Sequence, residues 1–220
     1  MSADLGSVPA KRPNRQRVRT RARIVAAGSR LLSSQSLDSL TIDDIVDAAK
    51  VAKGSFYNHF VDKMEFAQAV LEMARGDTEF KIFAANHEVK DPPRRIVRAL
   101  CVLLNYTEQH PERMLAALCL SEQHTTAASP VNIGVAADVR QGIEDGRLRC
   151  IDLDIGVVTI LGMFTVAVRH ATDPEVDASY QAVAHGVGAA LLRALGVDHG
   201  EALSLVEEAI AEFFPENPSA

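Results

Sequence analysis

The sequence has 220 residues, with 23 basic and 29 acidic side chains and a net charge of -6, and 47% of its residues are hydrophobic. A soluble chain of this length buries a sizeable core in one or two globular domains. Only 5% of the residues are aromatic and none is tryptophan, which favours packed helices and argues against an all-β architecture.

The cysteines and the apolar runs bear on the cellular compartment. Cys101, Cys119 and Cys150 form no CxxC pair and no plausible disulfide framework, so we expect reduced thiols and no structural zinc. The first 18 residues lack the apolar stretch of a secretory signal. The longest uncharged apolar run, residues 155–168, is short of the roughly 20 residues that cross a membrane. These features predict a cytoplasmic protein without a membrane span, in which residues 155–168 form a buried helix.

The charge is unevenly divided along the chain. Residues 1–75 hold 12 basic and 8 acidic side chains, whereas residues 76–220 hold 11 and 21. Seven of the basic residues fall within residues 11–23, and the first 37 residues contain a single acid, Asp4. A basic cluster of this kind suits a polyanion, although a solvated tail and an exposed helix face have the same composition.

Two helices are predicted in the first fifty residues. They follow a proline- and charge-rich arm, residues 1–16, that we expect to be disordered. Apolar residues recur at helical spacing from about residue 17 to 34. A second helix begins at Thr41, whose side chain can cap the backbone N–H of Asp44. The apolar face of that helix consists of Ile42, Ile45, Val46 and Ala49.

A third, shorter helix must begin by Lys53 so that Phe56 and Phe60 lie on one face, four residues apart. Only residues 50–52 then separate it from the helix before it. Two short amphipathic helices joined by such a bend form the helix-turn-helix pattern, whose second helix enters the major groove of DNA. Gly54 lets the backbone approach the sugar-phosphate chain closely. The outward face carries hydrogen-bonding side chains: Lys53, Ser55, Tyr57, Asn58 and His59.

Seven further helices are predicted after this unit. Apolar periodicity, with proline or serine at helix starts and glycine at helix ends, places them at about residues 62–85, 92–109, 111–125, 129–146, 154–171, 177–195 and 200–214. In the first of them we expect Phe66, Val70, Met73, Phe80 and Phe83 to point inward. The predicted fold is all-α, with an arm (1–16), a DNA-binding domain (17–66), a larger helical domain (67–214) and a tail (215–220).

Residues 40–63 resemble the DNA-binding signature of the tetracycline-repressor (TetR) family of bacterial transcription regulators almost position by position. The resemblance covers roughly residues 18–66 and implies that matching positions of the second and third helices contact DNA. Lys63 has a separate rationale, because it stands in the first turn of a helix where N–H groups and a cation can meet one phosphate. With the basic first helix and the outward face included, the expected DNA-binding residues are Arg17, Arg19, Arg21, Thr41, Lys53, Gly54, Ser55, Tyr57, Asn58, His59 and Lys63.

The chain departs from the family pattern at the bend. Lys50 occupies a position that usually holds glycine and is expected to need a positive φ, at a cost on the order of 1 kcal/mol. Ala52 replaces the serine often found at the start of the third helix, which removes a cap. Asp43, Asp44 and Asp47 are interpreted as solvent-facing partners of the helix dipole.

Two later helices predict a homodimer. Residues 155–168 are apolar nearly all round, and small residues in the next helix allow a neighbouring backbone to come close. The resemblance implies that these helices pair with their symmetry mates in a four-helix bundle; burial inside one subunit is the alternative. Two heads about 34 Å apart would then read a near-palindromic operator. The expected dimerisation residues are Ile155, Val158, Leu161, Phe164, Ala182, His185, Gly186, Ala189 and Leu192.

The resemblance also implies an inducer pocket among the middle helices, and the aliphatic composition favours a hydrophobic or amphipathic small molecule. Core packing is the alternative role for each candidate. The expected ligand-binding residues are Phe66, Met73, Phe80, Phe83, His87, Cys101, Tyr106, Met114, Cys119, His124 and Phe164.

Motifs for catalysis are missing from the sequence. It contains no GxSxG, no P-loop and no HExxH, and Gly186-Val187-Gly188 lacks the third glycine and the preceding strand of a dinucleotide site. We therefore expect no enzyme activity, no metal and no cofactor. The predicted function is a homodimeric repressor that a small-molecule inducer releases from double-stranded DNA. The alternatives are the same head controlled by a protein partner or by cysteine oxidation, and an all-α enzyme with an accessory DNA-binding head.

Overall fold

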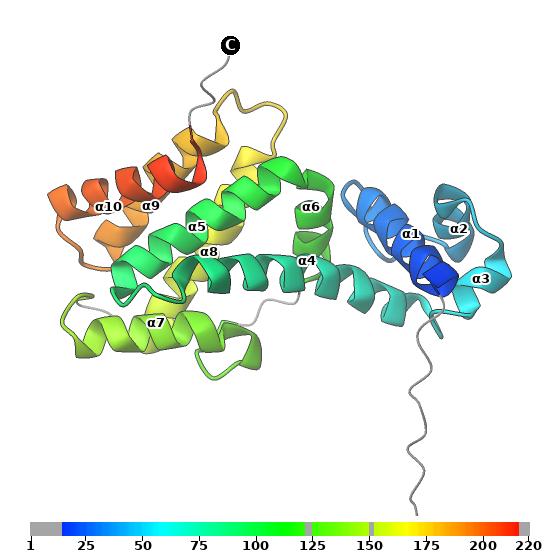
Figure 1. The fold of residues 1–220 in the computed structure, drawn as a ribbon, viewed down its shortest axis with the longest axis horizontal. Coiled ribbons are helices and arrows are strands. Elements are labelled where there is room, and N and C mark those ends of the chain that lie inside the picture. Colours follow the sequence, from blue (N-terminus) through cyan, green and yellow to red (C-terminus); the bar gives the residue numbers. More distant parts are fainter. Residues whose placement is uncertain (1–14, 122–124, 150–151, 216–220) are drawn as a thin grey trace, which may run out of the picture.

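The computed structural model describes residues 15–121, 125–149 and 152–215, and all regular structure within them is helical (Figure 1). This confirms the predicted all-α fold. Most of the predicted arm, His124, Cys150 and residues 216–220 of the tail lie outside the described residues. The helices are α1 Arg15–Leu32, α2 Ile42–Ala49, α3 Lys53–Tyr57, α4 Lys63–Asn86, α5 Pro92–Gln109, α6 Pro111–Leu120, the 3-10 turn η1 Pro130–Asn132, α7 Ile133–Glu144, α8 Leu153–Ala171, α9 Tyr180–Ala194 and α10 His199–Phe213.

Two hydrophobic cores organise the chain. The first joins α1, α2, α3 and the start of α4, and we call this part the head. The second core is built from α5 and α7 to α10. Helix α4 runs from the head into the rest of the molecule, and α6 stands between the two parts (Figure 1). Because Ala116 of α6 is buried in the first core, the head packs directly on the larger helical part.

Several helix ends differ from the prediction. Helix α6 ends at Leu120, about five residues early. The segment after Ser129 begins as a 3-10 turn rather than an α-helix, and the Ser129 side chain makes no capping hydrogen bond. Helix α9 begins three residues later than expected, where the Ser179 hydroxyl accepts a hydrogen bond from the Ala182 N–H. The side-chain cap at Ser179 marks the start of α9, which apolar periodicity alone does not locate.

The expected inward orientation of Phe80 and Phe83 is wrong, because their side chains are 72% and 71% exposed. Thr78 is the buried residue in this part of α4. An α-helix turns by 100° per residue, so Phe80 lies about 200° and Phe83 about 140° round the axis from Thr78. Both phenylalanines therefore project away from the side that α5 and α6 cover.

Helix α8 corrects the expectation of a fully buried helix. It has 19 residues, long and apolar enough to cross a membrane by length and composition alone, and 28% of its apolar window is buried within the chain. Core helices of soluble proteins pass the same test. Ile155, Val158 and Val166 are all exposed. One face of α8 is therefore apolar and uncovered.

Candidate nucleic-acid interface

Helix α2 begins with the predicted capping box. The backbone N–H of Asp44 donates to the Thr41 hydroxyl at 3.1 Å, and the Thr41 N–H donates to the Asp44 carboxylate at 2.9 Å. The Thr41 hydroxyl also donates to that carboxylate at 2.6 Å. These hydrogen bonds hold the pKa of Asp44 below its usual value. We expected the Thr41 hydroxyl to contact DNA. In the structure it already donates its hydrogen bond to Asp44.

The bend between α2 and α3 has the predicted left-handed residue. Lys50 has φ 53° and ψ 51°, and its N–H donates to the carbonyls of Asp47 and Val46. The next N–H, from Val51, also returns to the Val46 carbonyl, at 3.0 Å. Ala52 then begins α3 with no side-chain cap, as expected. Residues 50–52 form the bend, and α3 therefore runs in a different direction from α2.

The inner side of α3 is fixed by three phenylalanines whose rings pack in tilted and edge-on contacts. The rings of Phe56, Phe60 and Phe66 lie 5.4 to 5.7 Å apart, and all three side chains are fully buried. Phe66 therefore belongs to the core of the head, which removes it from the expected inducer pocket. Gly28 of α1 packs so closely that a Cβ there would lie 2.8 Å from Phe66 Cε2.

The outer side of α3 faces solvent. Tyr57 is 53% exposed, which is a large exposed fraction for an aromatic side chain. Lys53, Gly54 and Asn58 are exposed as well, whereas Ser55 and His59 are half-buried at the margins. A Cβ on Gly54 would meet no atom within 4 Å, so packing does not demand glycine there.

Helix α1 adds basic side chains beside the end of α3. Arg17, Arg19 and Arg21 are all exposed. The Arg17 guanidinium donates to the Asn58 carbonyl at 3.3 Å, and Arg21 lies 5.1 Å above the Phe60 ring. We call the exposed residues of α3 together with Arg17, Arg19 and Arg21 the basic face. Arg17 and Arg21 lie on the side of α1 that contacts residues 58–60, whereas Arg19 projects about 160° round the helix axis from Arg21.

Neighbouring groups shift the pKa of two titratable side chains at this surface. Asp43 lies 2.8 Å from the Lys53 ammonium, and its hydrogen bond and charge raise the pKa of Lys53. Burial lowers the pKa of His59, and the charges of Arg17 and Arg21 lower it further. Both effects favour the neutral imidazole, which offers a ring N–H donor without a positive charge.

Lys63 differs from the expectation of a free phosphate ligand. Its ammonium donates to the carbonyl oxygens of Leu37 at 2.8 Å and Leu40 at 2.9 Å. It is half-buried and holds the segment that leads into α2. Without DNA, this cation has a structural role inside the head.

One functional candidate escaped the sequence analysis. The Arg23 guanidinium of α1 donates to the carbonyls of Ala49 and Lys50 at the end of α2. From the sequence, Arg23 was recognised only as one of the seven basic residues within residues 11–23. Arg23 is 26 residues before Ala49 and 27 before Lys50 in the sequence, so no local sequence pattern indicates this contact.

The structure does not bring the expected ligand-binding residues together. Cys101, Tyr106 and Met114 are buried, and the Tyr106 hydroxyl donates to Asp77 at 3.0 Å. Met73 and Phe164 are half-buried, whereas Phe80, Phe83, His87 and Cys119 are exposed. In the described part of the chain these side chains point in several directions, and they line neither of the two hollows described next.

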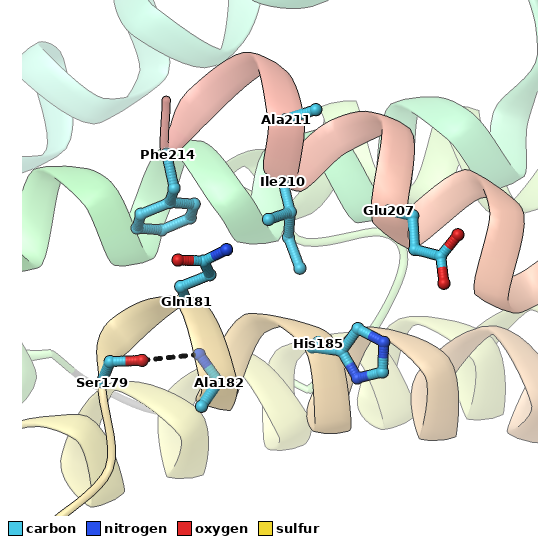
Figure 2. A pocket seen from close by; sticks show the side chains of 8 residues that line it. All are labelled: Ser179, Gln181, Ala182, His185, Glu207, Ile210, Ala211 and Phe214. Carbon is cyan, nitrogen blue, oxygen red and sulfur yellow. Dashed lines mark hydrogen bonds between the residues drawn. The ribbon is translucent and has the colours of Figure 1, made fainter. Parts of the chain in front are cut away.

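The larger hollow is a groove of about 730 Å³ between α9 and α10 (Figure 2). His185 of α9 and Glu207 of α10 stand on its facing walls, and Ile210 and Phe214 supply apolar surface. A second hollow of about 300 Å³ lies where Leu37 and Leu120 meet α4.

The expected dimerisation residues fall into two groups. Ile155, Val158, Ala182, His185 and Gly186 are exposed, and Leu161 and Phe164 are half-buried. Ala189 and Leu192 are buried in the second core of their own chain, with Leu192 0% exposed. These two residues are therefore removed from the predicted interface.

Comparison with known proteins agrees with this geometry. Residues 24–70 match the model of the bacterial regulatory proteins, tetR family. The HTH-type transcriptional repressor DhaR of Mycobacterium sp. (strain GP1) is 28% identical over 116 residues, covering 53% of this chain and 56% of the relative. The chain thus spans about half the length of that relative.

Solved structures extend the likeness along the chain. RolR in complex with resorcinol is 26% identical with a TM-score of 0.57, covering 87% of this chain and 94% of that one. A gamma-butyrolactone receptor (ArpA-like protein) has a TM-score of 0.69 at 19% identity, covering 90% and 99%, and shows the fold alone. Residues 24–70 thus match the tetR family of bacterial regulatory proteins, and the chain as a whole is similar in fold to these solved structures.

Proposed function

We propose that this protein is a transcriptional regulator that binds double-stranded DNA through the basic face. The observation that carries the proposal is the division of α3 into two sides. Phe56 anchors it from within, while the side chains of Tyr57 and Lys53 are exposed to solvent on the other side. A short helix presented in this way has the size and the donors to enter a major groove. We place the DNA-binding domain at residues 17–66 and the larger domain at 67–214.

The proposal includes a homodimer. Ile155, Val158 and Val166 form an exposed apolar stripe on α8, and the small residues Ala182 and Gly186 are exposed on the adjoining α9. Contiguous apolar surface of this kind supports association between copies. A two-fold axis through these helices would present two heads to a near-palindromic operator, about one turn of DNA apart.

Control by a small hydrophobic or amphipathic molecule completes the proposal, with the protein acting in the cytoplasm. RolR, which is similar over most of the chain, was solved with resorcinol bound. A thiol switch is the second candidate, because Cys119 is exposed where α6 meets the segment after α1, with its sulfur 3.8 Å from the Gln35 carbonyl. Cys101 is unsuited to that role, since burial raises the pKa of its thiol to about 12.

The test is a titration of the duplex that the wild-type protein selects from a random-sequence library. Tyr57→Ala should weaken binding by on the order of tenfold, the equivalent of one lost contact, with an unchanged melting temperature. Phe80→Ala is the matched control, because it removes another exposed aromatic side chain from a helix outside the basic face. Equal loss in both variants, or no loss in either, would reject the assignment of the basic face.

A further inference from the structure

Arg23 joins the first helix of the head to the bend that precedes α3. Its Nη2 atom donates to the Ala49 carbonyl at 2.8 Å and to the Lys50 carbonyl at 3.0 Å. The last carbonyls of a helix have no partner within the helix and carry its negative dipole end. A guanidinium placed there satisfies them and is attracted by them.

The residue that Arg23 holds has an unfavourable conformation. Lys50 is the single described non-glycine residue with a positive φ. A side chain disfavours this left-handed region, so the bend relaxes unless other contacts hold it. Three residues later the chain enters α3, which has only five residues and no side-chain cap of its own. Small changes at Lys50 therefore change the direction of the whole of α3.

We propose that Arg23 is a positioning residue, which binds the Ala49 and Lys50 carbonyls and thereby fixes the angle at which α3 meets DNA. This inference rests on the proposed function in DNA binding. Both arginines are exposed, but Arg19 has no hydrogen bond or ion pair within the described residues, whereas Arg23 donates to two carbonyls. Arg19 binds phosphate directly, whereas Arg23 acts through the bend.

The dependence of affinity on salt distinguishes these two roles. Each phosphate contact adds about 0.9 to the slope of log affinity against log salt concentration. Arg19→Ala should therefore make the slope shallower by about that amount. Arg23→Ala should lower affinity by on the order of tenfold, as for one lost charged hydrogen bond, and leave the slope unchanged. A slope that falls equally in both variants would show that Arg23 is a phosphate ligand and overturn the proposal.

Rescue provides a second test of the mechanism. Lys50→Gly removes the conformational cost at the bend, so Arg23→Ala should lose much less affinity in that background than in the wild type. An equal loss in both backgrounds would contradict the positioning role. If Arg23→Ala fails to fold, Arg23→Gln takes its place.

Failure of the proposed function is separable from failure of this inference. If the wild-type protein binds no duplex from the library, DNA binding itself is rejected. The contact between Arg23 and the bend is then tested by a double-mutant cycle of Arg23→Gln and Lys50→Gly in urea unfolding. Coupled free energies of unfolding support the clamp, and additive ones reject it.

Discussion

Lys63 shows how one side chain can serve a different purpose from the one its sequence position suggests. The position at the start of α4 indicated a phosphate contact. The structure instead directs the ammonium to the Leu37 and Leu40 carbonyls, which lie more than twenty residues earlier. Such a contact depends on the tertiary fold, so no local pattern predicts it.

Lys63→Ala should therefore destabilise the head as well as weaken DNA binding. Loss of two charged hydrogen bonds to half-buried carbonyls costs roughly 1 to 3 kcal/mol in the free energy of unfolding. Urea unfolding measures this change, and Lys81→Ala, which removes an exposed lysine farther along α4, is the control. Equal stability of the two variants would mean that the carbonyl contacts contribute nothing.

His59 should make DNA binding depend on pH. Burial, Arg17 and Arg21 keep its pKa below the usual value in the free protein, and a nearby phosphate would raise it. Binding then takes up a proton, so affinity should rise as the pH falls from 8 to 6. A pKa shift of one unit corresponds to about a tenfold change in affinity. His59→Gln should flatten the profile, and a profile that survives this change would assign the proton to another group.

At the scale of elements, local signals were sufficient for α2 and α3. The Thr41 capping box and the four-residue spacing of Phe56 and Phe60 lie within one or two turns, and both are present in the structure. The left-handed Lys50 was also expected, but from the resemblance to the TetR family, in which glycine is usual at this position. The predicted inward orientation of Phe80 and Phe83 was wrong, because apolar side chains indicate an inward face only where a neighbouring element covers them.

The packing of α1 against α4 leads to a paired prediction about glycines. A Cβ at Gly28 would lie 2.8 Å from Phe66 Cε2 and 3.0 Å from Val70 Cγ2, and Phe66 is held by two other rings. Gly28→Ala should lower the free energy of unfolding by roughly 1 to 3 kcal/mol. At Gly76 in α4 a Cβ meets nothing within 4 Å, so Gly76→Ala should stabilise by about 0.5 to 1 kcal/mol. Changes of the same sign in urea unfolding would refute this account of the packing.

At the scale of the whole molecule, the uncovered face of α8 determines the expected assembly. Val158→Asp places a charge within that apolar face and should yield single chains by size-exclusion chromatography with light scattering, with unchanged helicity. Val131→Asp, at a similarly exposed valine outside α8 and α9, should leave the dimer intact. A wild-type protein of single-chain mass would reject the homodimer.

The larger helical part was the least predictable from sequence. The number and order of its helices were largely anticipated, because proline and capping residues mark their starts. The inducer site was not, since its candidate residues divide between two cores and the surface. A binding cavity depends on the relative placement of several helices, which local sequence patterns do not predict.

The central claim is that the exposed side of α3 lies against DNA. Lysine acetylation followed by mass spectrometry, with and without the selected duplex, tests it at single residues. Lys53 should be protected by the duplex, while Lys81, another exposed lysine far along α4, should react at the same rate in both samples. Unchanged acetylation of Lys53 in a sample where the duplex is fully bound would contradict the account.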